Sequence, residues 1–505
     1  MTSSKFAETL TSGRLLARNV LWNLLGQTLP LLVGLAAIPP LVRGIGVPRF
    51  GVVSLAATMI GYASVFELGL GRALTKLVAA KLSTNDERGI PPLIWTSLLL
   101  MALLGLVGGA IMASIAPVLV YNFLTIPGSL QTETLHSFYL LASAIPIITV
   151  TSGLRGVLEA LQRFRLLNSI RVTIGVLILA GPLAMLPFSH ALEPVIAVLV
   201  VVRSLSALVH VYACFHAMPA LRHGFALDRT LLLPALRFGG WLTVSNIIAP
   251  IMAYMDRFLL GAIISVEAVA YYTAPFDMVT RVLVVPVAIA SVLFPAFTMS
   301  FAREPSRLAL LVSRGAKSIF LATFPAMMII IILAPEFLHL WLGAEFATQS
   351  SAVLQWLAVG VFINSLAQIP STLLQSAGRP DITAKLHLLE APLYLISLYL
   401  MAKARGIEGA AIVWTGRIIA DGALLLICAH RHVALGQNTM LRIALSAGLA
   451  LMVFYLASWV PGLLLKSLSL ALFALLFSIV AWAFILTAAE RALLRDWRRA
   501  MSGSS

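Results

Sequence analysis

Long apolar runs, separated by short polar connections, dominate the pattern of hydrophobic and polar positions along the chain. Runs such as Leu98–Val120 and Leu463–Ala489 reach the roughly 20 residues that an α-helix needs to cross the hydrocarbon core of a bilayer. The pattern therefore predicts an all-α integral membrane protein with about fourteen transmembrane helices. The predicted spans are 19–42, 50–80, 91–117, 134–161, 166–187, 193–218, 236–262, 267–299, 308–334, 350–377, 381–402, 407–431, 440–460 and 464–488.

Composition supports this class and excludes an ordinary soluble protein. The 505 residues are 60% hydrophobic and only 11% charged, whereas soluble domains average roughly 25% charged residues. A net charge of +15 would indicate nucleic-acid binding in a soluble protein. In a membrane protein it reflects Lys and Arg in cytoplasmic loops, so we expect no nucleic-acid partner. Two cysteines exclude a disulfide framework, and about 18 polar residues before the first span argue against a cleavable signal peptide.

The distribution of Lys and Arg predicts the orientation. Placing both termini in the cytoplasm puts 24 of the 35 basic residues on that side and six inside spans. Because cytoplasmic loops carry the excess of Lys and Arg, we predict cytoplasmic termini. Five basic residues fall on the opposite side: Arg43, Arg49, Lys403, Arg405 and Lys466.

An internal repeat divides the chain. Trp22 matches Trp241 near the beginning of the repeat, and three later matches, with a slightly smaller offset, are Arg203 with Arg417, Cys214 with Cys428 and His216 with His430. A few loop insertions would produce this drift in the offset. We predict pseudo-symmetric six-helix lobes at 1–219 and 234–432, followed by two additional helices at 438–490. Parallel repeats of this kind are a transporter architecture.

Ten charged residues stand out inside the predicted spans: Glu67, Arg72, Arg203, Asp256, Arg257, Asp277, Arg281, Glu390, Arg417 and Asp421. Exposed to lipid at roughly 3 kcal/mol each, they would cost about 30 kcal/mol. Most must therefore pair or line an aqueous cavity, which we expect between the two lobes.

Two interpretations of these charges stay open: they pair with other protein groups, or they line an aqueous cavity. The pairs Asp277/Arg281 and Arg417/Asp421 have i,i+4 spacing and can neutralise each other on one helix. Glu67-Leu-Gly-Leu-Gly71 can instead form an interhelical hydrogen bond beside closely packed glycines. Arg203 has no acid one turn away, which favours a cavity. The histidines form no ligand cluster, so no metal site or cofactor is predicted.

The charges also suggest a coupling hypothesis. The five acids and five arginines sum to zero when all are ionised. Protonating an acid, or covering it with Na⁺, leaves positive charge that guanidinium groups can direct at a phosphate. Ion binding at an acid and anion binding at arginines would then be coupled.

Four segments resemble the Wzx-type lipid-linked oligosaccharide flippases of the MOP exporter superfamily, which have a MATE-like fold. They are Asn19 to Gly26, Gly46-Val-Pro-Arg-Phe-Gly51, Glu67-Leu-Gly-Leu-Gly71 and Gln375-Ser-Ala-Gly-Arg-Pro380. The resemblance implies a bacterial inner-membrane flippase. Such a protein moves an undecaprenyl-pyrophosphate-linked oligosaccharide, for example an O-antigen unit of lipopolysaccharide, to the periplasmic leaflet by alternating access.

The same resemblance implies roles and partners. We predict substrate binding by Arg203, Arg257, Arg281 and Arg417. We predict ion coupling, to H⁺ or Na⁺, by Asp277, Asp421, Asp256, Glu67 and Glu390. Membrane lipids and the polysaccharide polymerisation machinery are the further partners expected.

Three other functions compete. A multidrug/cation antiporter shares the two-lobe fold but typically stops at twelve spans, and a lipid II flippase belongs to the same superfamily. A membrane glycosyltransferase or oligosaccharide ligase would need catalytic residues on sizeable periplasmic loops. The largest such loop, 118–133, has one acid and no Lys or Arg. We therefore expect a transporter rather than an enzyme.

Overall fold

The computed structural model describes residues 29, 32–84, 86–222, 251–252, 254–301, 305–433, 437–485 and 491. Among these residues, ten helices are long and apolar enough to cross a membrane. α15 (Pro380–Val433) holds two predicted spans, 381–402 and 407–431, which meet at Gly406 with φ 63°. The predicted all-α membrane fold is confirmed. The predicted beginnings of the spans 19–42 and 236–262 lie outside the described residues.

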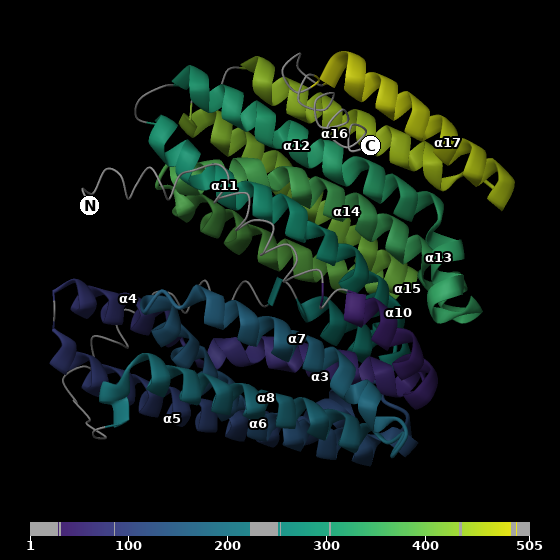
Figure 1. The fold of residues 1–505 in the computed structure, drawn as a ribbon. Helices are drawn as coiled ribbons and strands as arrows, with labels where there is room; N and C mark the ends of the chain where they lie inside the picture. The colour runs from purple at the N-terminus through teal and green to yellow at the C-terminus, as the bar shows by residue number, and fades with distance from the viewer. Residues whose placement is uncertain are drawn as a thin grey trace, which may run out of the picture. The chain divides into compact units, whose positions relative to one another are not determined.

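The chain forms two compact units. The first unit comprises Met1–Arg281 and Ala384–Trp414. Within it α5, α6 and α8 pack side by side, α7 covers α8, α4 contacts α6, and α10 contacts α3 (Figure 1). Besides part of α15 and the helical residues 254–263, its helices are Leu32–Ile45, α3 Val47–Phe66, α4 Leu70–Ser83, η1 Glu87–Gly89, α5 Ile90–Val118, η2 Leu119–Phe123, α6 Gly128–Ala160, α7 Phe164–Met185, α8 Leu192–Ala217, η3 Pro219–Arg222 and α10 Val266–Thr280.

The second unit comprises Val282–Thr383 and Thr415–Ser505, and the turn η5 (Arg281–Leu283) lies at its start. α14 is its centre and packs against α11, α12, α13 and α16, while α17 contacts α12. Besides the rest of α15, its helices are α11 Val284–Phe301, α12 Pro305–Ile332, α13 Ala334–Leu342, α14 Ala344–Ser376, α16 Gln437–Ser458, α17 Leu463–Val480 and η6 Ala481–Ile485. The lobe boundaries drawn from the sequence repeat stay a prediction.

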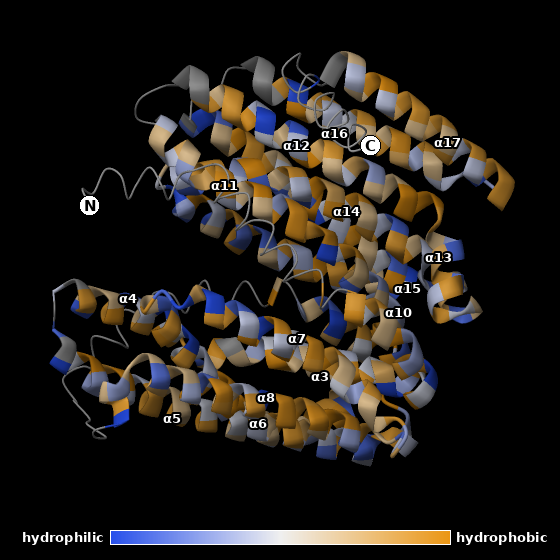
Figure 2. Ribbon diagram, in the orientation of Figure 1, coloured by the Kyte–Doolittle hydropathy of each residue, from blue (hydrophilic) through white to orange (hydrophobic). Residues whose placement is uncertain are grey.

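The surface has the character of a membrane protein. Hydrophobic residues run along the outer helices of each unit, as the orange ribbon of α5 and α17 shows (Figure 2). Leu103 and Leu106 of α5 are more than half exposed, and no residue of α17, all of which the structure describes, is buried. Exposing such apolar faces to water is unfavourable, whereas contact with lipid chains is not.

The predicted span 50–80 is wrong as a single helix. The structure breaks it at Glu67–Gly69, between α3 and α4. Leu68 and Gly69 both take positive φ, 49° and 70°. Leu68 is strained in this conformation because its Cβ crowds the backbone, whereas glycine tolerates it. The acidic-Leu-Gly motif therefore forms an interruption inside a membrane span.

The structure also explains the residues at three positions of the segment from Gly46 to Gly51. Gly46 takes φ 83° and directs the chain into α3. Arg49 forms a 3.1 Å ion pair with Glu133 of α6. Gly51 lies so close to the carbonyl group of Val266, at the start of α10, that a Cβ at this position would overlap it. Only glycine fits such a backbone approach.

Candidate functional site

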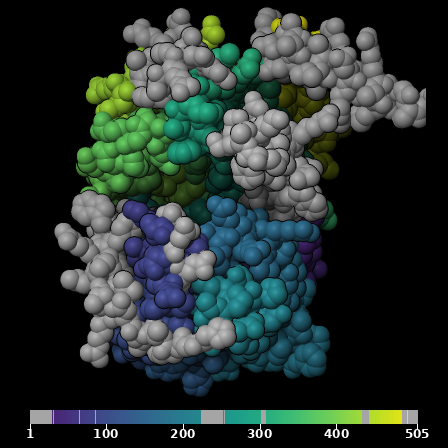
Figure 3. All heavy atoms as spheres, turned by 60° about the vertical axis from the view of Figure 1, so that its left-hand side comes forward, coloured from purple at the N-terminus to yellow at the C-terminus, as the bar shows by residue number. Residues whose placement is uncertain are grey.

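A polar pocket of about 340 Å³ lies inside the first unit. It is enclosed by α6, α7, α8 and the break between α3 and α4, and the blue and teal residues of α7 and α8 form part of the surface in Figure 3. Its volume is in the range of small-molecule sites. The lining residues with polar or charged side chains are Glu67, Thr151, Ser152, Arg155, Arg171, Arg203, Ser206 and His210.

Positive charge predominates in this pocket. Its lining has three arginines, one from each of α6, α7 and α8, and a single carboxylate, that of Glu67. With His210 neutral, the lining carries a formal charge of +2. Arg72 adds a positive charge near Glu67, and Glu159 adds a negative charge near Arg155. These two charges cancel, so the net charge of +2 is unchanged. Several guanidinium groups in one pocket suit a phosphate or pyrophosphate ligand.

The helix break positions Glu67 against α6. The Ser152 hydroxyl group donates a hydrogen bond to the Glu67 carboxylate. A Cβ on Gly71 would come within 2.9 Å of that hydroxyl group. A Cβ on Gly156 of α6 would come within 2.6 Å of the Gly71 carbonyl oxygen, and Thr75 Oγ1 donates to the Gly156 carbonyl at 3.1 Å. The predicted interhelical hydrogen bond beside closely packed glycines is confirmed.

Polar residues on one face of α8 complete the pocket. Arg203, Ser206 and His210 have i, i+3, i+7 spacing, which places them on the same side of the helix. Arg203 therefore lines a cavity, as its sequence context favours, and its role in substrate binding remains a prediction. Sequence reasoning did not select Arg155, Arg171 or His210. The spacing along α8 is the signal that identifies His210.

A second charged cluster in the first unit surrounds Arg257. Its Nη2 donates to Asp277 Oδ1 at 2.6 Å, and its Nη1 donates to Thr58 Oγ1 at 3.2 Å. The guanidinium group also lies 5.6 Å and 5.3 Å from the ring centroids of Tyr254 and Phe276. Arg257 is 5% exposed. The arginine is thus held by contacts from three helical segments.

Asp256 belongs to the same cluster. Its two carboxylate oxygens accept hydrogen bonds of 2.8 Å from the Arg257 backbone N–H and the Tyr272 hydroxyl group. Asp256 is 1% exposed. Asp277 makes a 2.6 Å ion pair with Arg257, which lies on a separate helical segment. Arg257 is buried in this pair, and Asp277 is partly exposed.

The other predicted residues lie apart from these two groups. The Arg281 guanidinium group lies against Gly34. Glu390 is buried in the α15 segment of the first unit. Arg417 and Asp421 lie one turn apart on the α15 segment of the second unit, and Asp421 is buried. Of the nine predicted site residues, the polar pocket brings together Glu67 and Arg203.

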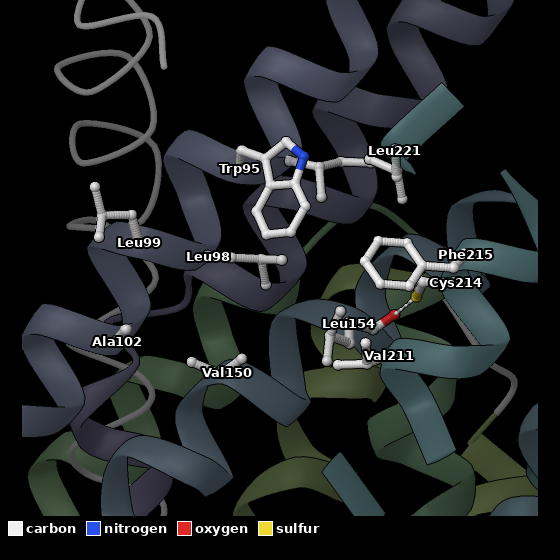
Figure 4. A pocket seen from close by; sticks show the side chains of 11 residues that line it. Trp95, Leu98, Leu99, Ala102, Val150, Leu154, Val211, Cys214, Phe215 and Leu221 are labelled. Carbon is white, nitrogen blue, oxygen red and sulfur yellow. Dashed lines mark hydrogen bonds between the residues drawn. The ribbon is translucent and has the colours of Figure 1, made fainter. Parts of the chain in front are cut away.

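An apolar pocket of about 240 Å³ is lined by residues of α5, α6 and α8 (Figure 4). Leu154 and Cys214 meet there, and the Cys214 thiol donates to the Leu154 carbonyl at 3.4 Å. Arg155, the residue after Leu154, lines the polar pocket instead. Helices α6 and α8 thus line both a charged pocket and one whose lining includes Trp95 and Phe215.

Comparison with known proteins identifies the family. The polysaccharide biosynthesis protein family matches residues 16–301. The "Putative O-antigen transporter" of Shigella flexneri is 32% identical over 409 residues, covering 81% of this chain and 96% of that protein. The chain belongs to the polysaccharide biosynthesis protein family. The predicted family resemblance is confirmed, and the polar pocket lies within the matched residues.

Solved structures share the fold of this family member. The lipid II flippase MurJ, in an inward closed conformation, matches with a TM-score of 0.70 at 12% identity and covers 92% of this chain and 99% of its own. An inward-facing multidrug resistance MATE transporter of the MOP superfamily matches with a TM-score of 0.68 at 16% identity, covering 81% and 94%. At these identities the matches establish the fold alone.

Proposed function

We propose that this protein is a flippase that moves a polyprenyl-pyrophosphate-linked oligosaccharide, such as an O-antigen unit, across the bacterial inner membrane. The polar pocket carries the proposal, because arginines from three membrane-spanning helices line it. An O-antigen transporter named among the relatives supports the oligosaccharide class. The multi-pass fold supports a membrane location, and both termini are proposed to be cytoplasmic.

The arginines supply the substrate chemistry. A pyrophosphate presents several oxygens, and guanidinium groups donate paired hydrogen bonds to such oxygens. Arg203 lies about four helical turns, or about 21 Å, from the end of α8. Arg155 and Arg171 lie closer to the neighbouring ends of α6 and α7, at about 8 Å and about 10 Å. The arginines thus form a path inward from the predicted cytoplasmic side.

Alternating access follows from the same charges. A headgroup entering from the cytoplasmic leaflet neutralises the charge of the pocket. The arginines then no longer need water around them, so the cytoplasmic side can close. Closure there and opening on the other side release the headgroup, while the polyprenyl chain stays in lipid. Arg257, Arg281 and Arg417 are proposed as further substrate contacts. Asp256, Asp277, Glu390 and Asp421 are proposed to act in ion coupling.

Reconstitution tests this function. Purified protein in liposomes should move a fluorescent polyprenyl-pyrophosphate-linked oligosaccharide between leaflets, and Arg203→Gln should abolish most of that movement. Transport of unrelated cationic drugs instead would favour the antiporter, and cleavage of the glycan linkage would favour an enzyme.

A second arm tests coupling by the acids. Asp277→Asn and Asp421→Asn should change the dependence of transport on pH or Na⁺. Unchanged dependence in both variants would remove these acids from coupling.

A further inference from the structure

His210 is a buried histidine whose tautomer follows from its hydrogen bond. Its ring lines the polar pocket, and Nδ1 lies 2.7 Å from the carbonyl oxygen of Ser206. A carbonyl oxygen only accepts, so Nδ1 carries the hydrogen. In a neutral imidazole the basic atom is then Nε2. The histidine can take up one proton at Nε2 without giving up its contact with the backbone.

The groups around His210 determine which cation the pocket accepts. Arg155, Arg171 and Arg203 bring three positive charges from α6, α7 and α8, and Glu67 brings one negative charge from the α3–α4 break. Sodium sites in proteins are built from convergent oxygens, whereas this lining has an excess of fixed positive charge. A metal cation needs several such oxygens, and this lining has a single carboxylate, that of Glu67. A proton needs only a lone pair, which Nε2 supplies.

The same excess charge connects proton uptake to anion binding. In the empty pocket the positive charge of the lining, above all that of Arg155, opposes a charge on His210. A bound pyrophosphate reverses the local charge, so protonation of Nε2 becomes favourable. The resulting imidazolium can donate a charge-assisted hydrogen bond to a phosphate oxygen. By linkage, a proton on His210 must strengthen anion binding by the same factor.

We propose that His210 is the proton-binding residue of this pocket and that a proton is taken up there together with the pyrophosphate headgroup. This inference rests on the proposed function and names the coupling ion as H⁺ rather than Na⁺ at this site. It assigns the proton to a histidine of the first unit, in place of Glu67, the acid predicted for coupling there.

The test uses farnesyl diphosphate, a short polyprenyl diphosphate, and the full-length protein in nanodiscs. We expect affinity to be about tenfold higher at pH 6 than at pH 8, as one charge-assisted hydrogen bond allows. Calorimetry at pH 7 in two buffers of different ionisation enthalpy should show net proton uptake on binding. Replacing Na⁺ by choline should leave the affinity unchanged.

Two variants at position 210 separate charge from folding. His210→Gln should bind weakly at both pH values and lose the protein's share of proton uptake, and the titration of the diphosphate itself remains as the baseline. His210→Arg should bind tightly at both pH values. A misfolded pocket cannot produce this gain. His216→Gln is the matched control, since that residue lies on α8 outside the pocket lining and stacks on Tyr212 with a centroid distance of 6.3 Å.

The outcomes distinguish this inference from the proposed function. Wild-type protein that does not bind farnesyl diphosphate at either pH would contradict the proposed function. Wild-type binding whose pH response and proton uptake survive in His210→Gln would overturn the assignment of His210 alone. Loss of the response in Glu67→Gln instead would return the proton to the carboxylate, and a requirement for Na⁺ would also reject the proposal.

Discussion

The two units differ in the kind of side chain that they enclose. The first unit encloses arginines, a glutamate and a histidine between α6, α7 and α8. The second unit encloses phenylalanine rings where α12, α14, α16 and α17 meet. Phe324 is at the centre of this cluster, with ring centroids 5.1 Å from Phe454, 5.5 Å from Phe473 and 5.8 Å from both Phe362 and Phe477. The first unit thus has a charged pocket, and the second unit has an aromatic cluster.

The matched positions of the repeat show where the halves diverged. The offset that aligns Arg203 with Arg417 places Leu424 opposite His210. The slightly larger offset that aligns Arg163 with Arg379 places Ser371 opposite Arg155. At these two matched positions the second half thus lacks the imidazole and the guanidinium group of the first half.

Phe324→Ala should have the largest effect on stability. Removing a buried aromatic ring leaves a cavity and costs about 3 kcal/mol or more. We expect a clear fall in Tm of the detergent-solubilised protein, with farnesyl diphosphate affinity of the folded fraction close to wild type. Phe188→Ala is the control, because that side chain is 82% exposed. A loss of affinity without a loss of Tm would contradict the division of labour between the units.

Arg203→Gln should show the opposite pattern. A lost charged contact to phosphate costs up to about 3 kcal/mol, or roughly a hundredfold in affinity. Liposome flipping should fall accordingly while Tm stays within a few degrees of wild type. Arg417→Gln tests the second half and should reduce flipping less. Equal losses in the two variants would mean that both halves share the phosphate.

Asp277→Asn should destabilise the first unit moderately. Breaking a buried ion pair costs about 3–5 kcal/mol, but Asp277 is 42% exposed, so we expect about 2 kcal/mol. Arg257 would then keep Thr58 and the two aromatic rings as its contacts. Differential scanning fluorimetry should show a lower Tm, and Asp277→Glu should recover part of it. An unchanged Tm would mean that the ion pair contributes nothing to the fold.

The smallest effect is expected at the pair Glu336–Lys466, which joins α13 to α17 at 2.8 Å. Partial burial raises the pKa of Glu336, but the hydrogen bond from Lys466 outweighs it, and the pKa falls below its usual 4.5. A lowered pKa stabilises the fold above pH 4.5, and this stabilisation is lost as pH falls through the lowered value. Because Glu336 is 35% exposed, we expect less than about 1 kcal/mol.

Lys466→Met measures this contribution. Its Tm should lie below that of wild type at pH 7, and the difference should disappear near pH 3. A difference that persists in acid would show that the lysine stem, rather than its charge, holds α17.

Sequence patterns predicted the helices better than the contacts. The predicted spans 166–187 and 193–218 agree closely with α7 and α8 at both ends, because hydrophobic length is a local property. The Glu67–Gly69 break was missed, since a leucine at position 68 gives no sign of a positive φ. Arg155 falls inside the predicted span 134–161, but the local sequence did not identify it as a pocket residue. The Arg257–Asp277 pair joins two separate helical segments, and the spacing of residues along one helix cannot reveal such a contact.

The contact of Gly51 with Val266 has a consequence for movement. It joins α3 to the start of α10 within the first unit, at the end of the membrane predicted to face the periplasm. The backbone N–H of Thr125 adds a 2.8 Å hydrogen bond to Gly261 at the same end. Under the proposed function, these contacts must separate before the headgroup can leave on that side. A larger side chain at position 51 would push α3 away from α10 and keep this side of the protein from closing.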